Sequence, residues 1–188
     1  MKKLTTPLDK KILAGLKAGE EVLLSGIIYT ARDQAHKRLV DLILAGKKLP
    51  LDLNGQVIYY CGPTATPQGR VIGSCGPTTS SRMDAFVEPL LAQGLVATIG
   101  KGRRYAAVRE VMKKYQALYL VAPAGCGALL AGKVVKNKLI TFKDLGPEAI
   151  HELEVKDFPL IVAIDTNGNS IYQDLQKESY ETQRWKKF

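Results

Sequence analysis

The pattern of apolar and polar residues switches repeatedly between the period of a strand and the period of a helix. Residues 22–29 form a nearly continuous apolar run, which is typical of a buried strand. The apolar positions of 31–44 fall on one helical face, and Thr30 stands where the N-cap of that helix is expected. The other predicted elements are strands over 53–60, 71–73, 95–99, 118–122, 160–164 and 170–172, and helices over 78–93, 103–115 and 147–153.

Small and turn-forming residues mark the connections between these elements. Residues 123–127 are small and predict the start of a short helix, and Asn137-Lys138 predicts a hairpin between 134 and 142. Thr166-Asn167-Gly168 predicts a second hairpin. Residues 1–20 have a mixed pattern that defines no element. The alternation of strands and helices with two late hairpins predicts an α/β fold with a mixed sheet, in a single domain over 1–188 that ends in a polar tail over 173–188.

The formal net charge of +9 raises the possibility of a nucleic-acid partner. The basic residues are spread over 32–48, 101–114 and 133–143 rather than gathered in one arm. Aromatic residues make up only 7% of the chain, which does not favour a module that stacks on bases. A spread positive charge attracts anions in general. No apolar run approaches the ~18 residues of a membrane-spanning helix, and the N-terminus has no signal-peptide pattern.

The cysteines Cys61, Cys75 and Cys126 are too far apart in sequence to form a metal site of their own. No Cys-x-x-Cys pair is present, so we expect this chain to bind no metal. An odd and sparse set of cysteines also argues against a secreted disulfide scaffold and favours a reducing cytoplasm. We expect buried thiols, with a reactive Cys126 at the start of a helix as the alternative.

The segment 74–84 carries the most informative chemistry. Its Gly76-Pro77 turn leads into a predicted helix whose first turn holds two threonines and two serines. A helix N-terminus presents free backbone N–H groups to an anion. Arg82 lies four residues after Thr78, and its guanidinium matches the geometry of a carboxylate. These residues indicate an anion site, although a polar capped helix with Arg82 in solvent explains them equally well.

Two further segments offer cationic side chains. In Gly100-Lys101-Gly102 the glycines would let a ligand approach the backbone beside Lys101, whereas a solvated surface turn is the alternative. Arg32 and His36 lie one helical turn apart and could bind an anion and move a proton, because histidine titrates near neutral pH. A surface arginine beside a packed histidine is the alternative there.

Five segments in this order resemble a known enzyme family. They are Ser25-Gly-Ile-Ile-Tyr-Thr-Ala-Arg-Asp-Gln-Ala-His36, Gly76-Pro-Thr-Thr-Ser-Ser-Arg-Met-Asp84, Gly100-Lys-Gly102, Pro123-Ala-Gly-Cys-Gly127 and Asp157-Phe-Pro159. The set is similar to the beta subunit of class I fumarate hydratase and of L-tartrate dehydratase, and to the C-terminal domain of the single-chain class I fumarases. The similarity extends from about residue 5 to Tyr172, which is nearly the whole chain.

The resemblance implies a swivelling β/β/α fold and a 4Fe–4S-dependent hydro-lyase. It places the cluster on cysteines of a separate alpha subunit, so this chain is expected to act as the beta subunit of a hetero-oligomer. The implied reaction is the reversible hydration of a dicarboxylate, with fumarate to L-malate as the first candidate and L-tartrate dehydration as the alternative. Neither a nucleic acid nor a membrane is implied as a partner.

The resemblance also implies roles for particular residues. Arg32, Thr78, Arg82 and Lys101 match the substrate-binding positions of the family. Thr78 matches the position suspected as the base for the C3 proton, although a hydroxyl is a weak base unless a cation stabilises its alkoxide. His36 is the alternative acid–base group. A nucleic-acid-binding module, or an anion-binding protein without catalysis, remains the alternative of a different class.

Overall fold

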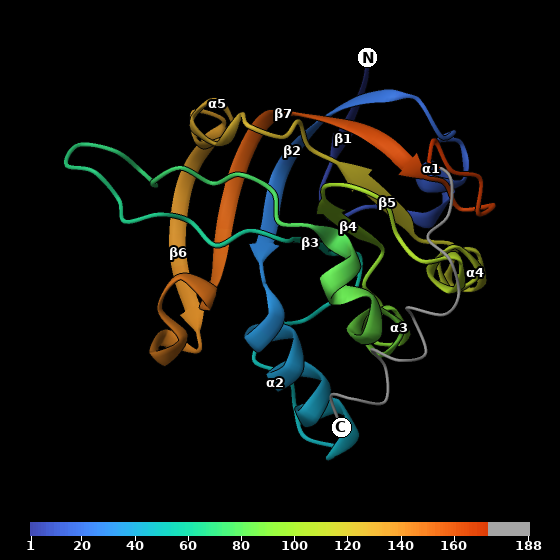
Figure 1. Cartoon of the computed structure of the whole chain (residues 1–188), viewed down its shortest axis with the longest axis horizontal. Coiled ribbons are helices and arrows are strands. Elements are labelled where there is room, and N and C mark those ends of the chain that lie inside the picture. The colour runs from blue at the N-terminus through green and yellow to red at the C-terminus, as the bar shows by residue number, and fades with distance from the viewer. Residues whose placement is uncertain (173–188) are drawn as a thin grey trace.

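The computed structural model describes residues 1–172, and the polar tail predicted over 173–188 lies outside them. Within the described residues, seven strands form one mixed sheet in the order β1-β2-β3-β4-β5-β7-β6 (Figure 1). Strands β1 to β5 are parallel, whereas β7 is antiparallel to its neighbours. The strands are β1 (Lys2–Thr5), β2 (Glu21–Thr30), β3 (Val57–Tyr59), β4 (Ala97–Gly100), β5 (Leu118–Val121), β6 (Val134–Thr141) and β7 (Ile150–Ile164).

The long strand β7 partly closes this sheet. One of its edges pairs with β2, from Glu152 opposite Tyr29 to Ile161 opposite Glu21. Its other edge pairs first with β6 and then with β5. Because β2 and β5 are also connected through β3 and β4, these strands form a ring that has β1 and β6 as additional strands.

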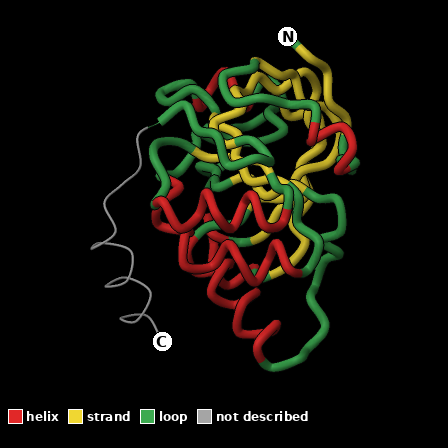
Figure 2. Tube along the Cα trace, turned by 90° about the vertical axis from the view of Figure 1, so that its right-hand side faces the viewer, coloured by secondary structure: helices red, strands yellow, loops and turns green. Residues whose placement is uncertain are grey.

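Three of the helices, α2, α3 and α4, gather on one side of the sheet (Figures 1 and 2). The short 3₁₀ helix η1 packs against both α2 and α3. The helices of the described chain are α1 (Lys10–Ala14), α2 (Asp33–Leu44), η1 (Ser80–Phe86), α3 (Val87–Ala92), α4 (Ala106–Tyr115), α5 (Gly127–Ala131) and η2 (Lys143–Glu148).

Side chains along β3 point alternately to the two faces of the sheet, and each face contributes to its own hydrophobic core. Val57 and Tyr59 belong to a cluster with buried residues of β1, β2 and β7, inside the partly closed sheet. Ile58 and Tyr60 belong to a second cluster with the apolar faces of α2, α3 and α4. Successive side chains of a strand point to opposite faces, so a continuous apolar run is required here.

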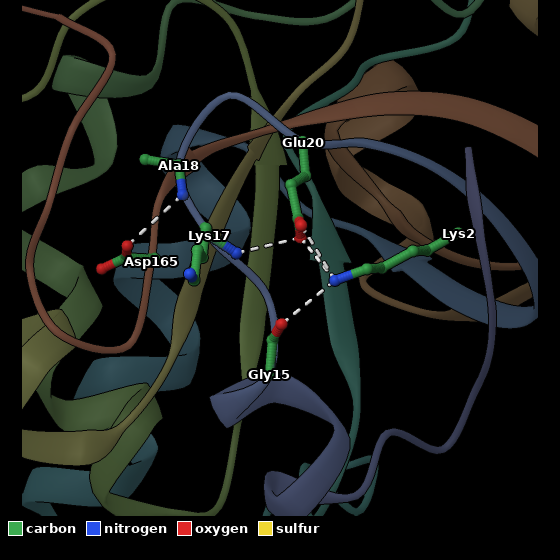
Figure 3. A network of polar contacts seen from close by, with 6 residues as sticks. All are labelled: Lys2, Gly15, Lys17, Ala18, Glu20 and Asp165. Atoms are coloured by element: carbon green, nitrogen blue, oxygen red, sulfur yellow. Dashed lines mark hydrogen bonds and ion pairs between the residues drawn. The ribbon is translucent and has the colours of Figure 1, made fainter.

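The N-terminal segment is attached to the sheet by polar contacts (Figure 3). The Lys2 ammonium lies 2.9 Å from the Glu20 carboxylate and donates to the Gly15 carbonyl oxygen at 3.1 Å. The Ala18 N–H donates to the Asp165 carboxylate at 3.3 Å. These contacts connect β1 with the end of α1 and with the segment before β2, and they connect that segment with the turn after β7. The mixed pattern of residues 1–20 predicts neither β1 nor α1.

The prediction of Thr30 as a helix N-cap is wrong. The residue at the N-cap of α2 is Arg32, whose side chain forms no capping hydrogen bond. The Thr30 hydroxyl instead donates to the Ala149 carbonyl oxygen at 3.3 Å and accepts from the His151 N–H at 3.0 Å. The hydroxyl therefore connects the end of β2 to the start of β7 rather than to its own helix.

Several predicted elements near the middle and end of the chain are also wrong. Residues 71–73 form bends rather than a strand, and the helix predicted over 78–93 is divided into η1 and α3. The hairpin predicted between 134 and 142 is the single strand β6, and the helix predicted over 147–153 is replaced by η2 and the start of β7. The turn at 166–168 is confirmed, since Asp165 N–H donates to the Asn169 carbonyl oxygen, but 170–172 forms only an isolated bridge.

Candidate functional site

The residues predicted to bind an anion lie where parallel strands end. Arg32 follows β2, Lys101 follows β4, and Thr78 comes at the end of the long segment after β3. A backbone hydrogen bond joins the ends of β2 and β3. The Ala31 N–H donates to the Tyr59 carbonyl oxygen at 3.1 Å. In open α/β sheets, ligands bind outside the carboxyl ends of the strands. The topology therefore brings these residues to a position suited to a ligand.

A short backbone ladder pairs Thr79 with Lys101, and Thr78 precedes Thr79 in this ladder. The Lys101 N–H donates to the Thr78 carbonyl oxygen at 3.2 Å, and the Ser80 N–H donates back to the Lys101 carbonyl oxygen at 2.9 Å. The Thr78 N–H donates to the Tyr60 carbonyl oxygen at 2.7 Å. The approach requires a glycine, because a Cβ at Gly100 would lie 2.0 Å from the Ser80 hydroxyl oxygen. Backbone contacts thus fix the position of both residues.

The serine at the start of η1 has a structural role. Ser80 is fully buried, and its hydroxyl lies 2.9 Å from the phenol oxygen of Tyr119. The same phenol oxygen lies 2.8 Å from the Gly102 carbonyl oxygen, which accepts its hydrogen. The Ser80 hydroxyl is therefore not available to an anion. Thr78 precedes η1, which is a 3₁₀ helix that begins at Ser80. Thr78 and Arg82 are therefore not one turn apart on an α-helix, and that prediction is wrong.

Arg82 forms a two-point ion pair with Asp33. Its Nε donates to one carboxylate oxygen at 3.1 Å and its Nη2 donates to the other at 2.8 Å. The Arg82 side chain is 49% exposed and that of Asp33 is 18% exposed. Asp33 is the first residue of α2, so this pair connects η1 directly to the helix that follows Arg32.

Arg32 passes closely over the backbone that follows β3. A Cβ at Gly62 would lie 2.6 Å from Nη1 and 2.9 Å from Cδ of Arg32, so a side chain at this position would displace the arginine. The guanidinium is 3.9 Å from the Glu148 carboxylate, while its buried Nε has no hydrogen-bond partner among residues 1–172. Glu148 also accepts from the Gln34 N–H at 2.8 Å. Glu148 thus contacts both Arg32 and the first turn of α2.

His36 lies one turn further along α2 and is fully buried. Its Nδ1 lies 2.9 Å from the Arg32 carbonyl oxygen, which can only accept, so Nδ1 carries the hydrogen. Its Nε2 is buried and has no hydrogen-bond partner in the described part of the chain, and its ring packs against Tyr60 and Phe86. Burial lowers the pKa of His36 to about 4. The structure therefore places a neutral imidazole behind Arg32, without exposure to solvent.

Comparison with known proteins decides the family. The sequence model of the family described as Fumarase C-terminus matches residues 2–175 of the chain. The chain belongs to this family. The resemblance found in the five ordered segments is thereby confirmed.

The relatives of this chain are dehydratases or hydratases, which are lyases. It is 44% identical over 180 residues to a Methanocaldococcus jannaschii protein provisionally named L(+)-tartrate dehydratase subunit beta, with 93% of this chain and 92% of the relative covered. It is 38% identical over 183 residues to the L(+)-tartrate dehydratase subunit beta of Escherichia coli strain K12, with 94% and 90% covered. It is 39% identical over 171 residues to the anaerobic class I fumarate hydratase of the same strain, covering 88% of this chain and 31% of that protein.

The Fumarase C-terminus chain also contains a buried ion pair that the sequence did not reveal. The Arg104 guanidinium donates to the Asp84 carboxylate, which also accepts from the Tyr105 N–H at 3.0 Å. Arg104 lies over the rings of Tyr60 and Tyr119. Asp84 belongs to η1, so the pair holds the helix that carries Arg82. A buried charge requires such a partner, but only the fold shows which residues meet.

The cysteines do not provide a cluster site in this Fumarase C-terminus chain. Cys61 and Cys75 are buried, while Cys126 is half-buried. Over residues 1–172, no group of three or more His, Cys, Asp or Glu side chains is arranged to hold a metal ion. No helix of the same range is long and apolar enough to cross a membrane.

Proposed function

We propose that this chain is the beta subunit of an iron–sulfur-dependent hydro-lyase that adds water to, or removes it from, a dicarboxylate. The observation that carries the proposal is the placement of Arg32 after β2 and of Lys101 after β4, with Arg82 on η1 paired to Asp33 of α2, in a member of this lyase family. A dicarboxylate has two negative charges, and arginine and lysine side chains complement them. The names of the relatives support the same class of reaction.

In this proposal Arg32, Arg82 and Lys101 bind the carboxylates and Thr78 takes the C3 proton. A threonine hydroxyl becomes a useful base only when a nearby cation stabilises its alkoxide. The backbone hydrogen bond from the Lys101 N–H to the Thr78 carbonyl oxygen keeps the two residues close, which supports Lys101 as that cation. His36 was the alternative base. Its burial favours a different role, in which the imidazole supports the Arg32 backbone from behind.

The side chains of residues 1–172 do not fit a 4Fe–4S cluster, because no three His, Cys, Asp or Glu side chains among them are arranged to hold a metal. We propose that an alpha subunit holds the cluster and that the two chains form a cytoplasmic hetero-oligomer. The partly closed sheet with its helices is, in this proposal, the swivelling β/β/α domain, which would bring the strand ends toward the alpha subunit. The names of two relatives, each a subunit beta, support a two-chain enzyme.

The substrate proposed first is fumarate, in exchange with L-malate, and L-tartrate is the alternative. The relatives include both a tartrate dehydratase subunit and a fumarate hydratase, at 38% and 39% identity. The two hydroxy acids, L-malate and L-tartrate, differ by one hydroxyl group. A site discriminates against such an analogue strongly only where it forms a hydrogen bond to that hydroxyl.

Anaerobic co-expression with an alpha-type chain tests the proposed function. The purified complex should dehydrate L-malate or L-tartrate, and the ratio of the two values of kcat/KM identifies the substrate. Each chain alone should be inactive. A complex with an intact cluster spectrum and no activity on either acid would contradict the proposal, and so would full activity of the alpha chain alone.

A further inference from the structure

The start of α2 involves both arginines of the candidate site, because Arg32 is its N-cap and Asp33, its first residue, binds Arg82. Arg32 extends over Gly62 toward Glu148, whereas the carboxylate of Asp33 turns to Arg82 on η1. Asp33 and Arg82 are 49 residues apart in sequence, so only the packing of η1 on α2 brings them together. Asp33 is thus the carboxylate that the fold presents to a proposed substrate-binding arginine.

Asp33 binds in a way that leaves some N–H donors of the Arg82 guanidinium free. A guanidinium has five N–H donors and offers two edges, each of which matches a carboxylate. Asp33 uses the edge made by Nε and Nη2. Among residues 1–172, Nη1 forms no hydrogen bond and Nη2 forms one only with Asp33, so the Nη2 hydrogen that faces Nη1 remains for the second edge. One carboxylate can therefore be bound by the second edge while Asp33 keeps the first.

The exposure of the two side chains agrees with this division. Asp33 is the more buried partner, at 18%, whereas Arg82 is 49% exposed. An exposed arginine without a partner has many rotamers and loses that freedom when it binds a ligand. An ion pair on one edge restricts these rotamers before the ligand arrives, which lowers the cost of binding.

We infer that Asp33 is a positioning residue, which orients Arg82 so that its Nη1–Nη2 edge receives a substrate carboxylate. The inference rests on the proposed function, because it assumes that Arg82 binds substrate. Asp33 itself does not contact the reacting atoms. Its loss should weaken substrate binding in the ground state and the transition state alike, and should therefore raise KM with little change in kcat.

The test is a double-mutant cycle in the reconstituted alpha–beta complex, assayed with L-malate and with L-tartrate. The variants are Asp33→Asn, Arg82→Ala and both together. Glu88→Gln is the matched control, because Glu88 is also an acidic residue in the first turn of a helix and also forms an exposed ion pair, with Lys114 at 2.9 Å. Thermal unfolding of each complex monitors any purely structural effect.

We expect Asp33→Asn to raise KM at least fivefold with kcat within twofold of the wild type, and Glu88→Gln to change neither. Adding Asp33→Asn to Arg82→Ala should have no further effect, since Asp33 acts only through that arginine. If Arg82→Ala impairs the enzyme while Asp33→Asn is neutral, or while the two effects multiply, the positioning role is wrong and the proposed function stands. Full activity of Arg82→Ala would overturn both.

Discussion

Burial of His36 in α2 lowers the pKa of its imidazole to about 4, from an ordinary value of 6.5. At neutral pH the imidazole is uncharged in both the folded and the unfolded chain, so the histidine does not oppose folding. As the pH falls from 6.5 toward 4, the unfolded chain binds a proton that the folded chain excludes. The free energy of unfolding must therefore decrease across this window.

Replacing His36 with glutamine should remove this part of the pH dependence. Between pH 7 and pH 4.5, the wild type should lose about 2 kcal/mol more of its unfolding free energy than His36→Gln loses. Urea unfolding of both proteins at the two pH values measures this difference. His151, whose pKa burial also lowers, is present in both proteins and its effect cancels. Equal losses in the two proteins would show that His36 is accessible to protons in the folded chain.

The three cysteines should differ in reactivity because only one is partly exposed. A hydrogen bond to the Cys75 thiol, together with burial, raises the pKa of Cys61, and the thiolate is the reactive form. Cys126 is half-buried. A thiol-exchange reagent should label Cys126 in the native chain, and Cys61 and Cys75 only after unfolding in urea. Peptide mass spectrometry measures the order, and labelling of Cys61 as fast as Cys126 would contradict it.

At the scale of elements, the junction of β4, η1 and the loop before it depends on Gly100. A Cβ there would lie 2.0 Å from the Ser80 hydroxyl oxygen and 2.9 Å from a ring carbon of Tyr60. Ser80 is buried and hydrogen-bonded to Tyr119, so the ladder that carries Thr78 has to move. Extra atoms in a packed region cost about 1–3 kcal/mol.

We therefore expect Gly100→Ala to reduce the unfolding free energy by roughly 1–3 kcal/mol and to impair activity of the complex by more than tenfold. Gly15→Ala is the control, since a Cβ at Gly15 meets its nearest atom at an ordinary 3.5 Å. Urea unfolding and steady-state kinetics are measured on both variants. A fully active and stable Gly100→Ala protein would show that the Thr78–Lys101 ladder does not depend on this close approach.

The errors in the predicted elements come from contacts that are distant in sequence. Strand β2 was predicted correctly because its buried faces require a continuous apolar run. Asn137-Lys138 resembles a turn locally, but Asn137 Oδ1 accepts from the His151 ring at 2.8 Å and Lys138 lies opposite Glu152. These partners in β7 extend β6 through the segment. Local preference is a weak guide where cross-strand partners decide the conformation.

At the scale of the whole molecule, the sequence predicted the residues of the candidate site better than their environment. Thr78, Arg82 and Lys101 stand out because glycines and hydroxyl residues surround them. The two carboxylates that organise the site, Asp33 and Asp84, were not recognised. Their partners Arg82 and Arg104 come from other parts of the chain, and only the packed fold brings them together. The roles of the predicted residues in binding and catalysis stay predictions.

Most basic residues of the chain have no role in the proposed function. Of the excess that gives +9, the proposal uses only Arg32, Arg82 and Lys101. Lys101 differs from both arginines, because its ammonium forms no ion pair with any residue between 1 and 172. Its charge is thus available to an anion or to the Thr78 hydroxyl.

The most direct test of the central claim is the kcat/KM of the cluster-loaded alpha–beta complex carrying Lys101→Met. A charge placed at the reacting groups contributes about 10²–10³ in rate, so kcat/KM for the dicarboxylate should fall by that factor. Lys138→Met, which removes an exposed charge from β6, should remain within twofold of the wild type. If Lys101→Met retains wild-type kcat/KM, this chain does not supply the cationic half of the active site.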